Sequence, residues 1–200
     1  MISKLKQLSK NKSNLIFDFD KTIAQMEIDW SDWHKGVSQV YEKYDKQHGY
    51  KRGKNPHQYY NDLSVKHGYD LIEDVKKFVS DYEQEYTKSF TPYLELVDFI
   101  KQNKSHKKYV FSSNARSTVE LGLRELGIFD SIEKIISRDD VKKLKPDPEG
   151  FYLLDGFAQH KDSYLMIGDS KADQLAAKRA GISFLKCDYF GTYQFSSKSQ

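Results

Sequence analysis

Two aspartates, one residue apart, end a short apolar run near the start of the chain. The segment NLIFDFDKTI places Asp18 and Asp20 directly after the apolar residues 15–17. Side chains alternate along an extended backbone, so two acids at this spacing can do different chemical work at one strand end. Their like charges repel each other, and a nearby cation offsets that repulsion. The pair therefore indicates either a solvated strand end with incidental acids or a site that holds something cationic.

Other polar side chains follow apolar runs farther along the chain. Hydroxyl and amide groups follow one run, a carboxylate pair follows another, and a lysine stands between two runs in the segment KPDP. Groups of this kind could converge with the first two acids if the fold brings the ends of the runs together. The residues are Ser112, Ser113, Asn114, Lys145, Asp169 and Asp173.

Five apolar runs have the length of β-strands. Helical patterns separate them from the second run onward, and this alternation favours a parallel sheet with crossover helices. Ligands of such sheets lie outside the carboxyl ends of the strands, so the polar residues above are expected at one edge. The expected strands are residues 14–18, 108–112, 132–136, 164–167 and 182–185.

Cap residues indicate where the crossover helices begin and end. Thr91 and Pro92 are a suitable N-cap and first helical residue, which predicts a helix that opens there, with Leu94, Val97 and Ile100 on one face. Gly127 closes the next helical pattern, and Gly181 closes the last one. Four helices are expected. The first starts at residue 91, and the others cover residues 119–126, 148–159 and 172–180.

The region from about residue 25 to residue 90 breaks the alternation. Aromatic and aliphatic residues recur at helical spacing over residues 30–44 and 71–86, with a shorter helical stretch at 57–66. No strand is expected in this region. The pattern predicts a small helical insert after the first strand, and its Trp and Tyr stripes suit the core of that insert better than a ligand site.

The segments DFDKT, FSSN, KPDP and GDSKAD together resemble the four motifs of the haloacid dehalogenase superfamily, in the family's order. The resemblance is to the phosphatase branch that includes phosphoglycolate phosphatase-like and β-phosphoglucomutase-like proteins. It implies an α/β fold, with a Rossmann-like parallel sheet flanked by helices and a small all-α cap domain inserted after the first strand. The implied boundaries are residues 1–23 and 90–200 for the catalytic core and residues 24–89 for the cap.

The resemblance also implies a role for each acid. Asp18 would attack phosphorus and form an aspartyl-phosphate, and Asp20 would act as the general acid and base. Mg²⁺ is the implied cofactor, because a divalent cation offsets the repulsion between a carboxylate nucleophile and a phosphate dianion. Its implied ligands are Asp18, the main-chain carbonyl of Asp20, Asp169 and, directly or through water, Asp173.

Phosphate binding is assigned by the same resemblance to Ser112, Ser113, Asn114 and Lys145. Ser112 and Lys145 complete the implied catalytic set with the two motif-one acids. Asn114 suits a helix cap as well as a phosphate contact, and Ser170 suits a helix cap. The acids of residues 139–140 and 147 are expected on solvated loops.

Lys21 departs from the family pattern, which often has Gly at this position. If the backbone there requires a positive φ, a lysine is costly. The sequence does not indicate whether its cation points to solvent or toward a substrate.

Three functions are compatible with these motifs. The first is a Mg²⁺-dependent phosphatase for a small phosphorylated metabolite. A phosphomutase for a sugar phosphate would use the same two acids, and a phospho-ligand-binding protein without activity is the third. The presence of Asp20 argues against a dehalogenase, which has no alkoxide to protonate. The insert carries the basic residues His34, Lys35, Lys51, Arg52, Lys54 and His57, which suit an anionic metabolite or a solvated basic surface.

Composition restricts the other possibilities. The 200 residues are 30% charged and 38% hydrophobic, and the net charge of +3 comes from lysines spread along the chain, which favours solubility over nucleic-acid binding. No apolar run approaches the ~20 residues of a membrane span. The single Cys187 excludes an intramolecular disulfide, and the N-terminus lacks the apolar core of a signal peptide. A cytoplasmic protein of undetermined oligomeric state is expected, and the His spacing gives little support for zinc.

Overall fold

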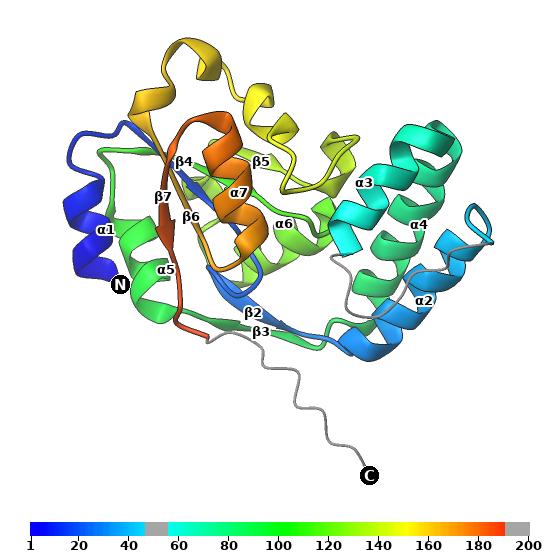
Figure 1. The fold of residues 1–200 in the computed structure, drawn as a ribbon. Coiled ribbons are helices and arrows are strands. Elements are labelled where there is room, and N and C mark those ends of the chain that lie inside the picture. Colours follow the sequence, from blue (N-terminus) through cyan, green and yellow to red (C-terminus); the bar gives the residue numbers. More distant parts are fainter. Residues whose placement is uncertain (47–55, 191–200) are drawn as a thin grey trace.

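A five-stranded parallel sheet forms the centre of the molecule (Figure 1). The computed structural model describes residues 1–46 and 56–190. The strand order β5-β4-β1-β6-β7 places β1 in the middle, so its carboxyl end lies where the strand order reverses. All five predicted strands are confirmed: β1 (Asn14–Phe17), β4 (Lys107–Phe111), β5 (Lys134–Ile136), β6 (Tyr164–Gly168) and β7 (Ser183–Lys186).

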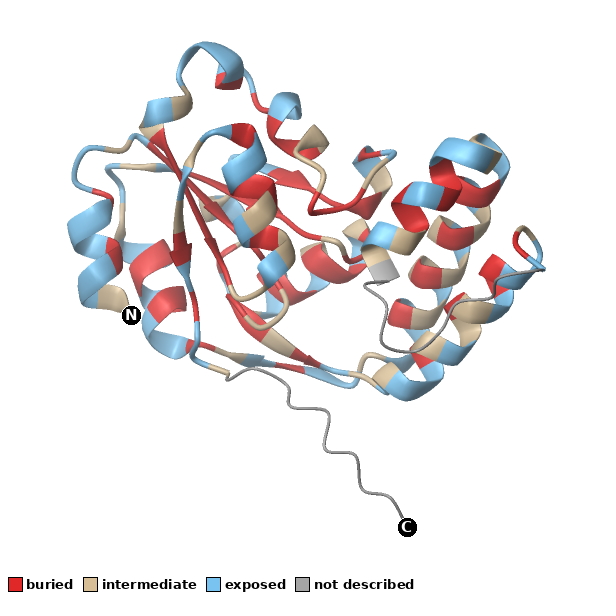
Figure 2. Ribbon diagram, viewed as in Figure 1, coloured by how far each residue is buried: buried red, intermediate tan, exposed pale blue. Residues whose placement is uncertain are grey.

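Helices cover both faces of the sheet because the strand residues alternate between two apolar cores. Leu15 and Phe17 face the core that contains α1 (Ile2–Leu8), α5 (Leu94–Gln102) and α6 (Arg116–Glu125). Ile16 faces the opposite core, which α7 (Lys171–Ala180) covers. β1 and β6 are buried throughout, and the helices bury their inner faces (Figure 2). The predicted C-terminal glycine caps are confirmed, because Gly127 and Gly181 have φ of 64° and 76°.

Three helices pack together beside the sheet (Figure 1). They are α2 (Trp30–Glu42), α3 (Pro56–His67) and α4 (Tyr69–Tyr86), which agree with the predicted helical insert. Asp29 caps α2 by accepting hydrogen bonds from two backbone N–H groups. Tyr41 and Tyr60 are buried, as expected for the core of the insert, whereas the buried Trp33 also lines a cavity beside the sheet. Lys51, Arg52, Lys54 and the polar tail 196–200 lie outside the described residues.

The prediction that residues 25–90 contain no strand was wrong. β2 (Ala24–Glu27) and β3 (Ser89–Pro92) form an antiparallel pair that joins the helical region to the sheet. Each strand is only four residues long, which is too short for a recognisable alternating pattern. Their pairing depends on residues more than sixty positions apart along the chain.

Two helix predictions also need correction. Pro92 ends β3 instead of opening a helix, and α5 begins at Leu94. A proline is tolerated at such a strand end because no ladder N–H is required there. Residues 148–159 form separate 3₁₀ turns instead of one helix, since Gly156 adopts φ of 70° between them. The 3₁₀ turns are η1 (Phe129–Ser131), η2 (Arg138–Asp140), η3 (Glu149–Leu153), η4 (Phe157–Gln159) and η5 (Lys161–Ser163).

Candidate functional site

The turn after β1 explains the spacing of the two motif-one acids. Phe19 is fully buried and packs edge-on against Phe90, with ring centroids 5.7 Å apart. Asp18 and Asp20, on either side of it, both line one cavity. The backbone N–H of Met26 in β2 donates a 2.8 Å hydrogen bond to Oδ1 of Asp20, so the strand pair missed by the sequence orients this carboxylate.

Lys21 adopts a left-handed backbone conformation with φ of 59°. Its N–H donates to the carbonyl of Ala24, which closes a tight turn. The position therefore does require a positive φ, and a β-carbon there is strained. The side chain of Lys21 lines the cavity beside the acids.

Lys145 brings three parts of the chain together at the end of β1. Its Nζ donates to Oδ1 of Asp18 at 2.7 Å, to Oδ1 of Asp173 at 2.6 Å and to the carbonyl of Phe111 at 2.8 Å. The side chain is only 3% exposed. Burial lowers the pKa of Lys145, but Asp173 and Asp18 outweigh burial and raise it, so the lysine is a cation.

Asp173 lies under the site at the start of α7. The side chain of Ser170 caps this helix and bonds the carboxylate of Asp173, which confirms the predicted capping role of the serine. A β-carbon on Gly168 would come within 2.7 Å of the Asp173 side chain. Glycine at the end of β6 therefore lets the helix start close to the strand.

Three carboxylates meet at this point. Each of Asp18, Asp169 and Asp173 offers one oxygen, and these oxygens lie within 4.8 Å of one another. Burial and the charge of Asp173 raise the pKa of Asp18, and they raise the pKa of Asp169 to about 6. Lys145 offsets part of the repulsion among the three acids. The hard oxygen donors and the remaining negative charge fit a divalent cation such as Mg²⁺.

Asp20 has a different environment from the three clustered acids. Burial raises its pKa to about 7, against the opposing effects of the Met26 N–H and the charge of Lys21. The two acids of the DFD segment are therefore distinct: Asp18 contacts a lysine, whereas Asp20 can hold a proton near neutral pH. Burial raises the pKa of both acids, so the distinction lies in their contacts: Asp18 accepts from the Lys145 ammonium and Asp20 accepts from the Met26 N–H. Different partners suit separate nucleophile and acid roles.

The motif-two side chains are arranged differently from one another. Oγ of Ser112 is buried and donates to Oδ1 of Asn114 at 2.9 Å, while Ser113 and Asn114 line the cavity. Asn114 does not cap α6, whose N-cap is Ala115. Its Nδ2 donates instead to Glu83 on α4. The phosphate-binding roles of these residues stay predictions.

The acids at positions 139 and 140, expected on a solvated loop, lie in the η2 turn, where Asp139 is half-buried and Asp140 is exposed. Asp139 accepts a 2.6 Å hydrogen bond from the backbone N–H of Arg116. Asp140 pairs with the Arg116 guanidinium and caps the η2 turn through Ser137. These contacts hold Ser137 and Asp139, the residues on either side of Arg138, and the Arg138 side chain is buried.

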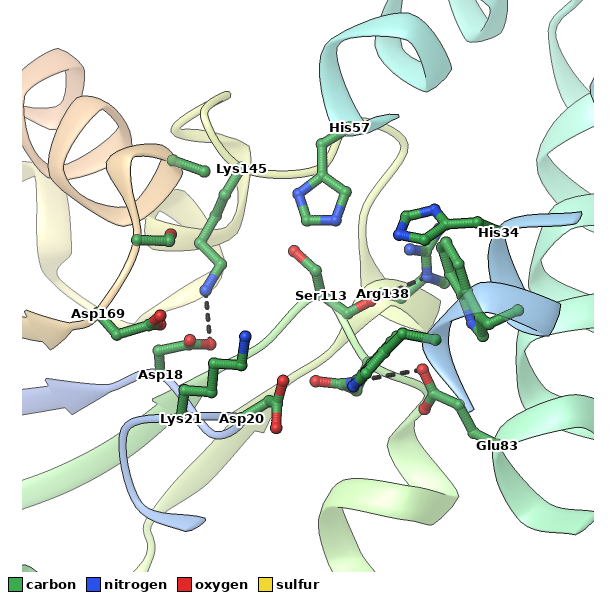
Figure 3. A pocket seen from close by; sticks show the side chains of 15 residues that line it. Asp18, Asp20, Lys21, His34, His57, Glu83, Ser113, Arg138, Lys145 and Asp169 are labelled. Atoms are coloured by element: carbon green, nitrogen blue, oxygen red, sulfur yellow. Dashed lines mark hydrogen bonds and ion pairs between the residues drawn. The ribbon is translucent and has the colours of Figure 1, made fainter. Parts of the chain in front are cut away.

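One cavity of about 270 Å³ contains the acids and the inner faces of the helical region (Figure 3). Sequence reasoning missed Glu83 and Arg138, which both line it. Glu83 continues the apolar stripe of α4 at a spacing of four residues, and an acid on a buried stripe is the signal that could have found it. The helical region contributes Trp30, Trp33, His34, His57 and Glu83, and the sheet side contributes the other lining residues.

His57 is the cavity histidine with the clearest charge state. Burial, together with the charges of Arg138 and Lys145, lowers its pKa to about 3. The imidazole is therefore neutral at physiological pH and hydrogen-bonds to the backbone of Lys145. It contributes polarity to the cavity but no positive charge.

The sequence profile of the haloacid dehalogenase-like hydrolases matches residues 15–187. The chain belongs to this family. The family assignment confirms the superfamily and the enzyme class that the four motifs predicted. None of the helices in residues 1–46 and 56–190 is long and apolar enough to cross a membrane.

Individual relatives of this haloacid dehalogenase-like chain are distant. The pyrophosphatase PpaX of Bacillus thuringiensis (strain Al Hakam) is 28% identical over 116 residues, 56% of this chain and 52% of the relative. PpaX of Bacillus cereus (strain Q1) matches to the same extent. The aligned part of the chain thus spans about half the length of these curated relatives.

Solved structures support the fold over most of the chain. A Bacteroides fragilis protein described as a haloacid dehalogenase-like hydrolase has a TM-score of 0.59 and 24% identity, and the match covers 88% of this chain and 87% of that one. A Lactobacillus plantarum protein described as a phosphoglycolate phosphatase has a TM-score of 0.58 and 19% identity, with 88% and 86% covered. The predicted α/β fold class is therefore confirmed.

Proposed function

We propose that the chain is a Mg²⁺-dependent phosphatase that hydrolyses a small phosphorylated metabolite through an aspartyl-phosphate on Asp18. The observation that carries the proposal is the arrangement of the two DFD acids. Asp18 lies against the Lys145 cation, and Asp20, on the other side of the buried Phe19, has a pKa of about 7. One acid is placed to attack while the other can hold a proton.

The chemistry requires two displacements at phosphorus. A carboxylate oxygen of Asp18 bonds to phosphorus, the bond to the ester oxygen breaks, and Asp20 protonates the leaving oxygen. Asp20 then takes a proton from a water molecule, which attacks phosphorus and breaks the bond to Asp18. Phosphate leaves, and both carboxyl groups return to their starting states.

Lys145 would balance charge on Asp18 and on the phosphoryl oxygens during both steps. Asp18, Asp169 and Asp173, with the carbonyl of Asp20, would hold Mg²⁺, whose charge would offset the repulsion between the carboxylate and the phosphate. Ser113 and Asn114 line the cavity beside these groups and would contact the phosphoryl group, and the Ser112 hydroxyl would orient Asn114.

Residues 24–89 would act as a cap over a core formed by residues 1–23 and 90–200. The helical region supplies a wall of the cavity, and its side chains would select the substrate. The name of the Bacillus relatives makes pyrophosphate one substrate to test, beside phosphate monoesters.

Turnover of p-nitrophenyl phosphate with and without Mg²⁺ tests the proposal. We expect Mg²⁺-dependent release of p-nitrophenol, and Asp18→Asn should lower kcat by at least about 10³-fold because an amide is a poor nucleophile. Asp32→Asn, on the exposed surface of α2, is the matched control and should retain activity. Near-normal kcat in Asp18→Asn would refute the covalent mechanism. No turnover at any pH or metal would favour the phospho-ligand binder, and transfer to a sugar hydroxyl without phosphate release would favour the phosphomutase.

A further inference from the structure

Arg138 is a buried cation in the cavity wall without an acid at ion-pair distance. It is 2% exposed, and its Nε donates to the carbonyl of Ser113 at 2.9 Å. Within residues 1–46 and 56–190, no ion pair includes Arg138, and its Nη1 has no hydrogen-bond partner. Buried charges are normally paired, because removing an ion from water is costly. The guanidinium therefore has capacity for an anion.

Two further polar groups in the same cavity lack partners. The indole Nε1 of Trp33 and Oγ of Ser113 are buried, and neither has a hydrogen-bond partner among the described residues. Such atoms are normally bonded in folded proteins, to protein or to water. Three of them in one cavity indicate that a ligand supplies what the protein does not.

The chemistry of these groups defines the ligand. A guanidinium and an indole N–H can only donate, and a serine hydroxyl can donate as well as accept. The matching ligand is an acceptor, and the cation favours a carboxylate or a phosphoryl group.

Glu83 is the nearby acid that could compete for Arg138. Its Oε1 accepts from Asn114 and its Oε2 accepts from the N–H of Ala115, at 3.0 and 2.9 Å. Burial also raises the pKa of Glu83. This carboxyl group is committed to the loop after β4, so it moderates the field at Arg138 without occupying its free donor.

Arg138 lies apart from Asp18 and Asp169 in the cavity (Figure 3). Figure 3 shows Asp18, Asp169 and Lys145 on one side and Arg138 on the other, with Ser113 between them. The cavity volume of about 270 Å³ corresponds to roughly nine waters at about 30 Å³ each. A phosphoryl group and one further small oxyanion, joined by one or two atoms, match this size.

We propose that Trp33 and Arg138 form a second oxyanion subsite, and Ser113 lies between this subsite and Asp18 (Figure 3). The subsite binds a carboxylate or a second phosphoryl group of the same substrate whose first phosphoryl group lies at Asp18. The inference rests on the proposed function and narrows the substrate class to small phosphorylated compounds with a second anionic group.

Two non-hydrolysable ligands test the subsite without turnover. Phosphonoacetate carries a carboxylate where isobutylphosphonate carries an isopropyl group, and the two have the same number of non-hydrogen atoms. Calorimetric titration at saturating Mg²⁺ should show at least ten-fold tighter binding of phosphonoacetate to the wild-type chain. Methylenebisphosphonate, titrated alongside, shows whether a second phosphoryl group is preferred to a carboxylate.

Variants assign the preference to the named donors. Arg138→Met should reduce the ratio of the two dissociation constants to within about two-fold, and Trp33→Phe, which removes the indole N–H, should reduce it several-fold. Affinity for isobutylphosphonate should stay the same in Trp33→Phe. Trp30→Phe is the matched control, because this second cavity tryptophan has no unsatisfied buried N–H, and it should keep the wild-type ratio.

The possible results separate the two proposals. Equal binding of both second-anion probes and isobutylphosphonate to the wild-type chain, or an unchanged ratio in Trp33→Phe, would overturn the subsite whether or not p-nitrophenyl phosphate is hydrolysed. Tighter binding of the second-anion probes than of isobutylphosphonate, without any turnover of p-nitrophenyl phosphate, would support the subsite and refute the phosphatase proposal. If Arg138→Met does not fold, Trp33→Phe compared with Trp30→Phe decides the question.

Discussion

Asn61 of α3 makes two buried hydrogen bonds to the backbone of Leu144, the residue before Lys145. Its Oδ1 accepts from the Leu144 N–H, and its Nδ2 donates to the Leu144 carbonyl, both at 2.7 Å. The helical region thus holds the loop that carries the lysine of the candidate site. A side-chain amide is one of the few groups that can satisfy both backbone groups at once.

Replacing Asn61 with Leu should therefore destabilise the fold and weaken catalysis together. Two backbone groups would lose their partners in a buried place, at a cost of about 1–3 kcal/mol for each group left unsatisfied. Urea denaturation measures the change in unfolding free energy, and kcat for p-nitrophenyl phosphate measures the effect on Lys145. Asp62→Asn, on the exposed face of the same helix, should change neither. Wild-type stability in Asn61→Leu would show that these hydrogen bonds do not hold the loop.

Asp20 should give the reaction a pH dependence that varies with the leaving group. Its pKa of about 7 means that the acid form is present below pH 7 and is lost as the pH rises. The kcat for an alkyl phosphate should fall through this range, because the alkoxide needs a proton, while p-nitrophenyl phosphate should respond less. Asp20→Asn should slow the alkyl phosphate by about 10²–10⁴-fold and abolish this pH dependence. Equal losses for both substrates would contradict the general-acid role.

The same carboxyl should influence stability in a defined direction. A folded pKa near 7, above the ordinary value of 3.8, means that the native state binds this proton more tightly than the unfolded state. The resulting stability is complete below about pH 4 and is lost as the pH rises through about 7. Relative to the wild type, Asp20→Asn should gain stability at pH 8 and not at pH 4. Urea denaturation of both proteins at pH 4 and at pH 8 measures the change in unfolding free energy caused by the substitution at each pH.

Mg²⁺ should raise the melting temperature, and Asp169 should control that response. A ligand that binds the native state at a hundred times its Kd adds about 2.7 kcal/mol. In metal-free buffer at pH 7.5, Asp169→Asn should melt higher than the wild type, because one of three clustered, mutually repelling acids is gone. The same variant should lose most of the Mg²⁺-induced rise, whereas Asp162→Asn on the surface should keep it. A full Mg²⁺ response in Asp169→Asn would exclude the triad as the metal site.

Lys21 allows backbone strain and charge to be measured separately. Lys21→Ala removes the cation and keeps a β-carbon at φ of 59°, whereas Lys21→Gly removes both. The glycine variant should be more stable than the alanine variant by about 1 kcal/mol. Both variants should raise the pKa of Asp20, since the lysine charge lowers it. Equal stability of the two variants in urea would show that the turn is not strained.

The candidate catalytic residues could be read from the sequence because the determining interactions are local. An apolar run of four or five residues forms a buried strand wherever it pairs, and the residue after it then lies at the sheet edge. Asp18, Asp169 and the motif-two residues were placed in this way. Alternation around Phe19 predicted that the two DFD acids would have separate surroundings.

Contacts between distant segments were decided by the tertiary structure. Glu83 is hydrogen-bonded to Asn114, 31 positions away, and Asn61 is hydrogen-bonded to Leu144, 83 positions away. No pattern in the sequence around one partner identifies the other. The β2–β3 pair was missed for the same reason, since four residues carry too little periodicity to reveal a strand without its partner. Arg138 looked like one charge in a polar RDD run, and it became a buried, unpaired cation because Asp139 and Asp140 bond elsewhere. Local pattern determined the chemistry at the strand ends, whereas long-range packing determined the cavity around it.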